Sequence, residues 1–178
     1  MIKKHKTIVV CAGLAVVLGA GVFLYLGASG ISIAGTMYRE EPRAMFSDID
    51  GNLVNLNDVH GKPTIIYSWA SASEGSRQQL TDMANIKTKY GDLVNSIAIN
   101  RGEEVGAVRA FVESAGAAGR LTILLDPQNS FYIVTQGANA HETYFVNHRG
   151  GITGRVNRAV TFSEMEEGLR NTDPGVFK

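Results

Sequence analysis

The sequence predicts an α/β sandwich, with a central mixed sheet flanked by helices and an N-terminal β-hairpin, preceded by one transmembrane helix. Three observations carry this prediction. Residues 7–28 contain no charged side chain. Beyond them, short β-rich runs alternate with stretches of helical periodicity. The last two β-rich runs follow each other directly, as antiparallel strands do, and a helix closes the chain.

The uncharged stretch 7–28 is 22 residues long. As a helix it is long enough to span the ~30 Å hydrocarbon core of a bilayer. Three lysines lie just before it, so we expect residues 1–6 in the cytoplasm and the rest of the chain outside. A cleaved signal peptide with a small-residue site at 32–34 is the alternative. Because the apolar core of a signal peptide is usually shorter, ~7–15 residues, we favour a retained anchor.

Residues 29–43 are expected to tether this anchor to a domain at 44–178. They mix glycine and proline with the charged cluster Arg39-Glu40-Glu41. A flexible tether of 15 residues reaches about 20–25 Å. The domain should therefore stay close to the membrane.

Charge and cysteine content exclude several classes of protein. Without the leading lysines the chain carries 14 basic and 17 acidic side chains, which leaves no basic footprint for nucleic acid. The single cysteine, Cys11, lies in the uncharged stretch and excludes an intramolecular disulfide or a cysteine-based metal site. Histidines are sparse too, with His60, His141 and His148 in the domain. We therefore expect no metal and no cofactor.

The domain is expected to begin with a hairpin at 45–59, because Asp50-Gly51-Asn52 separates two alternating runs. The apolar run 64–69 predicts the next strand. The spacing of apolar residues predicts a helix at 76–90, and Gly91 suits its C-cap.

The second half of the domain continues this alternation. We expect, in order, a strand at 93–100, a helix at 103–117, a strand at 121–125, one helical turn at 131–135, and strands at 142–147 and 151–156. Asp126 should bond to backbone N–H groups of the turn that follows it. Thr161 and Glu164 form a capping-box pattern that opens a terminal helix.

Several short motifs occur in a fixed order: Asp50-Gly51, Gly61-Lys62-Pro63, Trp69-Ala70, Asp126-Pro127 and the run 143–150. Their order and separation resemble the thioredoxin-like domain of membrane-anchored periplasmic thiol–disulfide oxidoreductases of the TlpA/ResA type. The resemblance covers about residues 46–170. It implies a thioredoxin-like fold.

Two departures from that family's pattern concern its active site. The family has two cysteines after the strand at 64–69, and the resemblance puts Ser73 and Ser76 at their positions. It has a cis-proline before the penultimate strand, and His141 stands there. A serine hydroxyl has no disulfide chemistry. A cis bond before another residue type costs ~2.5–4 kcal/mol, so we expect a trans bond. The resemblance therefore implies a redox-inactive protein.

Other roles for these residues stay open. Ser73 as a nucleophile needs a base within hydrogen-bond reach, and His141 invites an assignment as a base or metal ligand. We expect Ser73 or Ser76 to cap the helix instead, and His141 to make a polar contact. The rim of the former active site is the candidate docking surface, made up of Trp69, Ser71, Ala72, Glu74, Gly75, Ala138, Asn139 and Ala140.

The lost cysteines favour a function without catalysis. We expect a subunit in the inner membrane, with its domain in the periplasm. It should dock on an integral membrane protein complex or on a protein bound at the outer face of that complex. One alternative is a periplasmic carrier or chaperone for a peptide or for cytochrome maturation. Another is an enzyme with an unrecognised activity at the former active-site cleft.

Overall fold

The computed structural model describes residues 44–137 and 141–177. The chain divides into two compact units, 1–41 and 42–178, and the described residues belong to the second. In this described part no helix is long and apolar enough to cross a bilayer. The predicted anchor and tether (residues 7–43) lie outside it and stay predictions.

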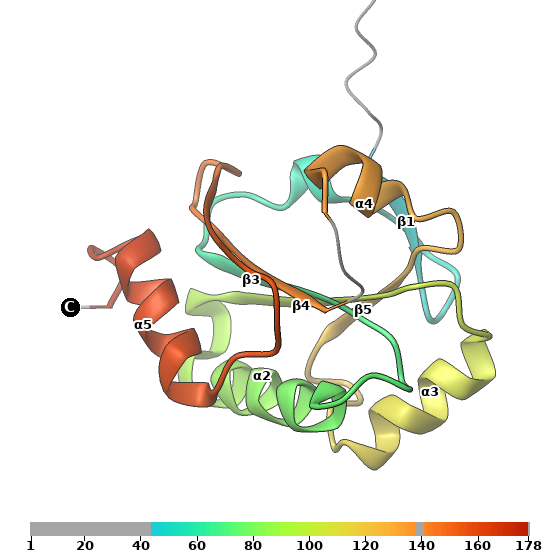
Figure 1. Ribbon diagram of the computed structural model, residues 1–178. Helices are drawn as coiled ribbons and strands as arrows, with labels where there is room; N and C mark the ends of the chain where they lie inside the picture. The colour runs from blue at the N-terminus through green and yellow to red at the C-terminus, as the bar shows by residue number, and fades with distance from the viewer. Residues whose placement is uncertain (1–43, 138–140, 178) are drawn as a thin grey trace, which may run out of the picture. The chain divides into compact units, whose positions relative to one another are not determined.

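The described residues build one seven-stranded sheet. Its strands are β1 Met45–Asp48, β2 Leu53–Asn55, β3 Thr64–Trp69, β4 Asn95–Asn100, β5 Thr122–Leu125, β6 Glu142–Val146 and β7 Ile152–Val156. They lie in the order β2-β1-β5-β4-β3-β6-β7 (Figure 1). β4 is parallel to both of its neighbours, β3 and β5. The other pairs are antiparallel, so the predicted mixed sheet with an N-terminal hairpin is confirmed.

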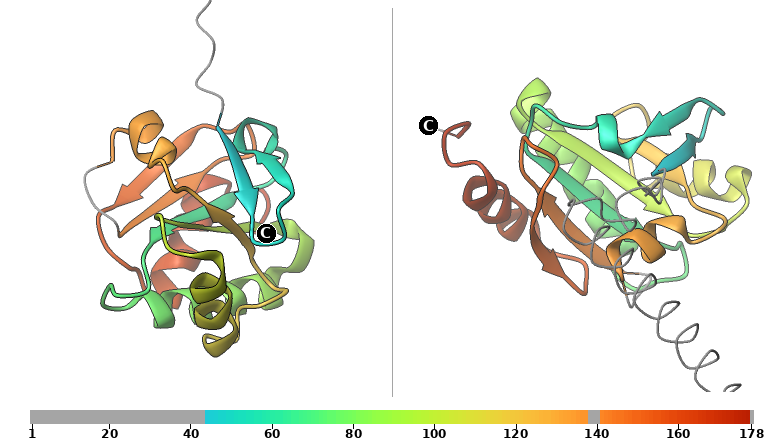
Figure 2. Two further views of the ribbon diagram at one scale, coloured as in Figure 1. Left: turned by 90° about the vertical axis from the view of Figure 1, so that its right-hand side faces the viewer. Right: turned by 90° about the horizontal axis from the view of Figure 1, so that it is seen from above.

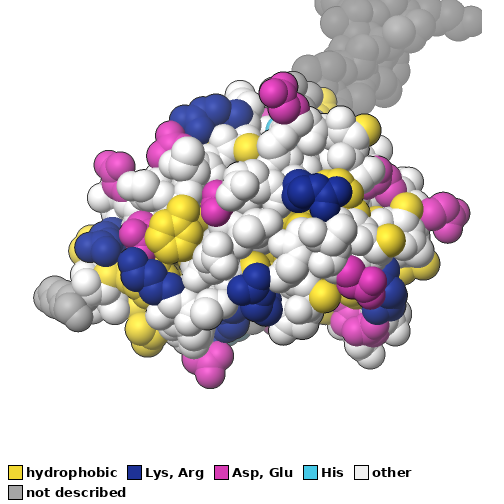
Figure 3. All heavy atoms as spheres, turned by 90° about the horizontal axis from the view of Figure 1, so that it is seen from below, with side chains coloured by type: hydrophobic (Ala, Val, Ile, Leu, Met, Phe, Trp, Pro, Cys, Tyr) yellow, Lys and Arg dark blue, Asp and Glu magenta, His cyan; other side chains and the backbone are white. Residues whose placement is uncertain are grey.

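Helices cover the two faces of the sheet unequally (Figures 1 and 2). One face packs against α2 (Ser76–Tyr90), α3 (Val105–Ser114) and α5 (Phe162–Thr172). The described part of the other face carries the short α4 (Ser130–Thr135) and a 3-10 turn at Leu56–Asp58. Seen from below, the three-helix side carries interspersed basic and acidic side chains (Figure 3).

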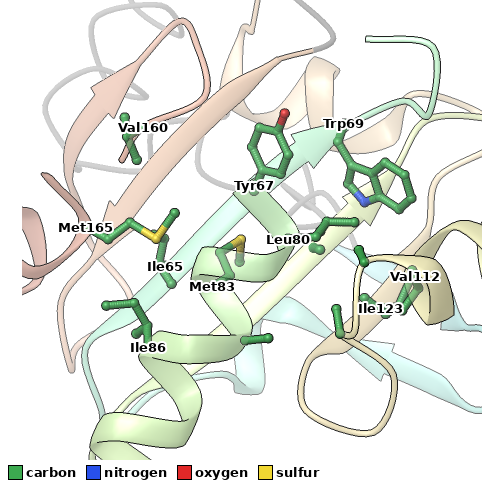
Figure 4. Close-up of a cluster of buried hydrophobic side chains, with 14 of the residues drawn as sticks. Ile65, Tyr67, Trp69, Leu80, Met83, Ile86, Val112, Ile123, Val160 and Met165 are labelled. Atoms are coloured by element: carbon green, nitrogen blue, oxygen red, sulfur yellow. The ribbon is translucent and has the colours of Figure 1, made fainter. Parts of the chain in front are cut away.

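β3 lies inside the sheet and contributes to both apolar cores, since side chains alternate between the faces of a strand. All six of its residues are buried. Ile65, Tyr67 and Trp69 face the three-helix layer (Figure 4), and Ile66 belongs to the core under α4. Burial on both sides explains why this strand reads as one uninterrupted apolar run.

Asp126 holds the start of α4 by the backbone hydrogen bonds that the sequence analysis predicted for it. The carboxylate of Asp126 accepts the backbone N–H groups of Ser130 at 2.7 Å and Phe131 at 2.9 Å. The ring of Phe131 is buried between Phe46 and Tyr144. This single apolar anchor leaves the rest of the helix at the surface.

The predicted helices and strands are confirmed with changes at their ends. α2 has the predicted bounds and ends at Gly91, whose φ is 55°. The capping box of α5 is present. The helix expected at 103–117 is shorter, because the N–H of Glu103 bonds to the side chain of Asn100 and Gly116, at φ 66°, follows the last turn. β4 begins late because a 3-10 turn follows α2.

Candidate functional site

The candidate site lies at the carboxyl end of β3, where residues 70–75 lead into α2. Ser73 lies in this loop, and Ser76 is the first residue of α2. β6 runs antiparallel to β3, so its amino end comes to the same edge. His141 directly precedes that end. The fold therefore gathers all three sequence-predicted positions at one edge of the sheet.

A chain of polar side chains, Tyr67, Ser76 and His141, joins two of these positions. The hydroxyl oxygen of Tyr67 lies 2.8 Å from Nδ1 of His141 and 3.2 Å from Oγ of Ser76. Ser76 Oγ donates to the carbonyl of Ala70 at 2.9 Å. Tyr67 and Ser76 are fully buried, and His141 is half-buried. The expected polar contact of His141 is confirmed, and its partner is the hydroxyl of Tyr67.

These contacts fix the direction of the hydrogen bonds. Each hydroxyl has one hydrogen, and Ser76 uses its own for Ala70. Tyr67 then donates to Ser76, and His141 must donate to Tyr67 from Nδ1. This arrangement satisfies all three contacts with one hydrogen each. The hydrogen-bond network therefore assigns the Nδ1–H tautomer to His141.

Burial keeps the two titratable members of this polar chain, Tyr67 and His141, neutral near pH 7. It raises the pKa of Tyr67, against a smaller lowering by the hydrogen bond to Ser76. It also lowers the pKa of His141. The polar chain is therefore a neutral bridge between β3, α2 and the residues before β6.

A carboxylate fixes the loop 70–75 from the other side. Glu103 accepts the backbone N–H of Ser71 at 2.9 Å and its hydroxyl at 2.5 Å. It also accepts Nδ2 of Asn100 at 2.5 Å. Burial raises the pKa of Glu103, but the hydrogen bonds from Ser71 and Asn100 outweigh it and hold that pKa below its ordinary value. Ionised Glu103 thus clamps the start of the loop to the end of β4.

The prediction that Ser73 or Ser76 caps α2 is wrong. The N-cap is Gly75, whose φ of 80° lies in the left-handed region that suits glycine, and it makes no side-chain cap. Ser76 is committed to Ala70 and Tyr67 instead. The described hydrogen bonds of Ser73 are made by its backbone. Buried, and with its hydrogen already donated, Ser76 is unsuited to act as a nucleophile.

The predicted docking surface is described in part. Its exposed or half-buried members are Ser71, Ala72, Glu74 and Gly75. Its members outside the described residues are Ala138, Asn139 and Ala140. The placement of Trp69 on this surface is wrong, because its side chain is fully buried and stacks on Phe111 with ring centroids 5.2 Å apart. As the last residue of an internal strand, Trp69 points into the three-helix layer.

Sequence reasoning missed a buried carboxylate beneath α4. Glu142, only 1% exposed, pairs with Nη2 of Arg155 at 2.6 Å and accepts the hydroxyl of Tyr144. Arg155 lies opposite Tyr144 in the β6–β7 register. A glutamate that opens an apolar strand, with an arginine on the next strand, is the signal that could have found this pair. The pair fixes the segment that carries His141.

The described part of the chain contains no group of three or more His, Cys, Asp and Glu side chains arranged to hold a metal ion. His148 pairs with Asp173, with Nδ1 2.5 Å from the carboxylate oxygen. The absence of a metal or cofactor stays a prediction.

Sheet order, helix layers and the strand-to-helix edge define the class of this domain as thioredoxin-like. The chain belongs to the AhpC/TSA family, which matches residues 39–154. It is similar to the thiol-disulfide oxidoreductase ResA of Bacillus subtilis, with 23% identity over 180 residues and 97% of each chain covered.

Solved structures agree on the fold. A secreted disulfide oxidoreductase of Mycobacterium tuberculosis, homologous to DsbE of E. coli, is 17% identical with a TM-score of 0.65, covering 75% of this chain and 98% of its own. StoA of Bacillus subtilis is 16% identical with a TM-score of 0.59, covering 70% and 93%. These neighbours support the thioredoxin-like fold. The match of Ser73 and Ser76 to the family's cysteines stays a prediction.

Proposed function

We propose that this protein is a redox-inactive thioredoxin-like subunit, anchored in the inner membrane by residues 7–28. Its domain docks on an integral membrane protein complex, or on a protein at the outer face of that complex, in the periplasm. The observation that carries the proposal is the presence of Ser73 and Ser76 where the chain passes from β3 into α2. Disulfide exchange needs a thiolate, and the single cysteine of this chain is Cys11.

Ser76 has a structural role in this domain, because its fully buried hydroxyl is bonded to Ala70 and Tyr67. The surroundings of the loop support permanent docking. Glu103 holds Ser71, so the exposed residues beside it form a preordered surface. A preordered surface loses less conformational entropy when a partner binds.

Reduction of insulin by the full chain tests the loss of redox activity. We expect turnover equal to that in buffer. The matched control is the double variant Ser73→Cys/Ser76→Cys, which restores two sulfur atoms and leaves His141 in place. Turnover by the unaltered chain would contradict the proposal. Activity in the variant alone would identify the serines as the cause of the loss.

Co-purification from native membranes tests docking. Ala72 is exposed in the loop 70–75, and Ala118 is exposed in the turn after α3. We expect Ala72→Glu to release the partner and Ala118→Glu to retain it, with unchanged circular dichroism in both. If the Ala72→Glu protein co-purifies as well as the unaltered chain, the docking surface lies elsewhere.

Protease added to intact spheroplasts tests topology. With residues 1–6 inside and the domain outside, the protease should digest residues 44–178. A protected domain would contradict a periplasmic location.

A further inference from the structure

Three consecutive apolar side chains of α4 are exposed to solvent. Ile133 is 71% exposed, and its neighbours Tyr132 and Val134 are exposed as well. Ile152, on the edge strand β7, is 52% exposed. Val134 and Ile152 line one cavity of about 110 Å³ between α4, the 3-10 turn and the sheet. We call Tyr132, Ile133, Val134 and Ile152 the α4 patch.

The described part of the chain begins beside this patch. The description begins at Ala44, which lines the same cavity as Val134 and Ile152. The 43 residues before Ala44 include the uncharged stretch 7–28. The described part of the chain therefore begins on the side of the sheet that carries the α4 patch.

Arginines lie at both ends of α4. The guanidinium of Arg101 lies 5.1 Å from the ring centroid of Tyr132 and bonds to the side chain of Asn129, the N-cap. Arg155 donates to the carbonyl of Gln136, the C-cap, at 3.3 Å. Arg155 also forms an ion pair with Glu142, and this pairing reduces the positive potential that Arg155 contributes near the α4 patch. An aromatic and aliphatic surface flanked by arginines is typical of segments that lie in the membrane interface.

The opposite side of the domain has a different character. Basic and acidic side chains are interspersed over the three-helix layer (Figure 3). Leu93 and Val105 are exposed there too, but they are single apolar side chains in different elements. The α4 side therefore presents a cluster of apolar side chains, whereas charged side chains of both signs are spread over the three-helix side (Figure 3). This difference is expected if only the α4 side contacts lipid.

We propose that the α4 patch rests on the outer surface of the bilayer that holds the anchor. Tyr132, Ile133 and Val134 enter the headgroup region, and Arg101 faces the phosphates of anionic lipids. This inference rests on the anchor and goes beyond the docking function, because it concerns a different surface. It implies that the domain lies on the membrane on its α4 side while the loop 70–75 stays available to a partner.

A fluorescent label on the full chain in lipid nanodiscs tests this contact. In a Cys11→Ser background, Ile133→Cys carries the label, and one chain is inserted into each disc of phosphatidylethanolamine and phosphatidylglycerol. Leu93→Cys is the matched control, because Leu93 is 53% exposed and follows α2 on the other side of the sheet. Lipids with a quencher in the acyl chain report contact with the bilayer, and iodide reports contact with water.

We expect the lipid quencher to dim the label at Ile133→Cys at least several-fold more than at Leu93→Cys, and iodide to show the reverse order. Equal quenching of the two labels by iodide would overturn the proposal. Protection of position 133 from both quenchers would overturn it too, because a segment of protein would then cover the patch. A chain that does not enter the disc would overturn it together with the anchor prediction.

Discussion

Replacing Tyr67 by phenylalanine tests whether the polar chain at the candidate site bridges the fold. The substitution keeps the buried ring and removes the hydroxyl that lies 2.8 Å from His141 and 3.2 Å from Ser76. A buried hydrogen bond contributes about 0.5–1.5 kcal/mol net. Ser76 keeps its bond to Ala70, and half-buried His141 regains water, so neither is left unsatisfied. We therefore expect a loss of about 1–2 kcal/mol.

Urea denaturation of residues 42–178, a compact unit of its own, measures this loss. With a slope of about 2 kcal/mol per molar urea, the midpoint should fall by about 0.5–1 M. Tyr132→Phe is the matched control, since Tyr132 is exposed and its contact with Arg101 is made by the ring. We expect the control to change stability by less than about 0.5 kcal/mol. Equal midpoints for the two variants would refute the bridge.

Nitrogen-15 NMR of His141 gives a second, independent result. The bonding pattern requires the proton on Nδ1, so the Nδ1 resonance should be that of a protonated ring nitrogen near pH 7. Tyr67→Phe should shift this equilibrium toward the tautomer that predominates in water. A proton on Nε2 in the unaltered domain would contradict the assigned directions of the hydrogen bonds.

Two further predictions concern stability. Gly168→Ala in α5 should destabilise the domain, because the added Cβ collides with the ring of Phe145. Such overpacking costs about 1–3 kcal/mol, more than the gain of about 1 kcal/mol from the higher helix propensity of alanine. In Gly106→Ala of α3 the added Cβ meets nothing within 4 Å, so this variant should stabilise the domain by about 0.5–1 kcal/mol. Urea midpoints of the two variants that move in the same direction would contradict these two predictions. The hydrogen bonds from Arg158 and Thr161 lower the pKa of Glu164 to about 2, so the stability that these bonds give is present above about pH 4.5 and is lost toward pH 2. Glu164→Gln should reduce that part of the acid sensitivity, and an unchanged pH profile of the urea midpoint would contradict it.

The sequence predicted those elements whose signals are local. The periodicity of α2, the Asp-Gly turn of the hairpin and the capping box of α5 each depend on a few neighbouring residues, and all three are confirmed. The cap of α2 was predicted wrongly because tertiary contacts decide it: Ser76 turns to Ala70 and Tyr67, and Gly75 takes the left-handed position.

The polar chain could not be found in this way. Tyr67 and His141 are 74 positions apart, and neither residue signals the other. Trp69 is a second residue whose position the local sequence did not predict. An aromatic residue next to an active-site motif suggests a binding surface. In the fold, the alternation of side chains along β3 and the position of α3 place Trp69 against Phe111 in the core.

The strand order also has a consequence for the order of folding. The hairpin is synthesised early, but β1 pairs with β5, where Ser47 lies opposite Leu125. The hairpin can therefore join the sheet only after most of the domain has been synthesised. β3 likewise gains its second neighbour only with β6. Such long-range pairing slows folding and leaves strand edges open in partly made chains. A chain that stops before Thr122 would keep β1 with one unpaired edge, at which strands of other chains can add.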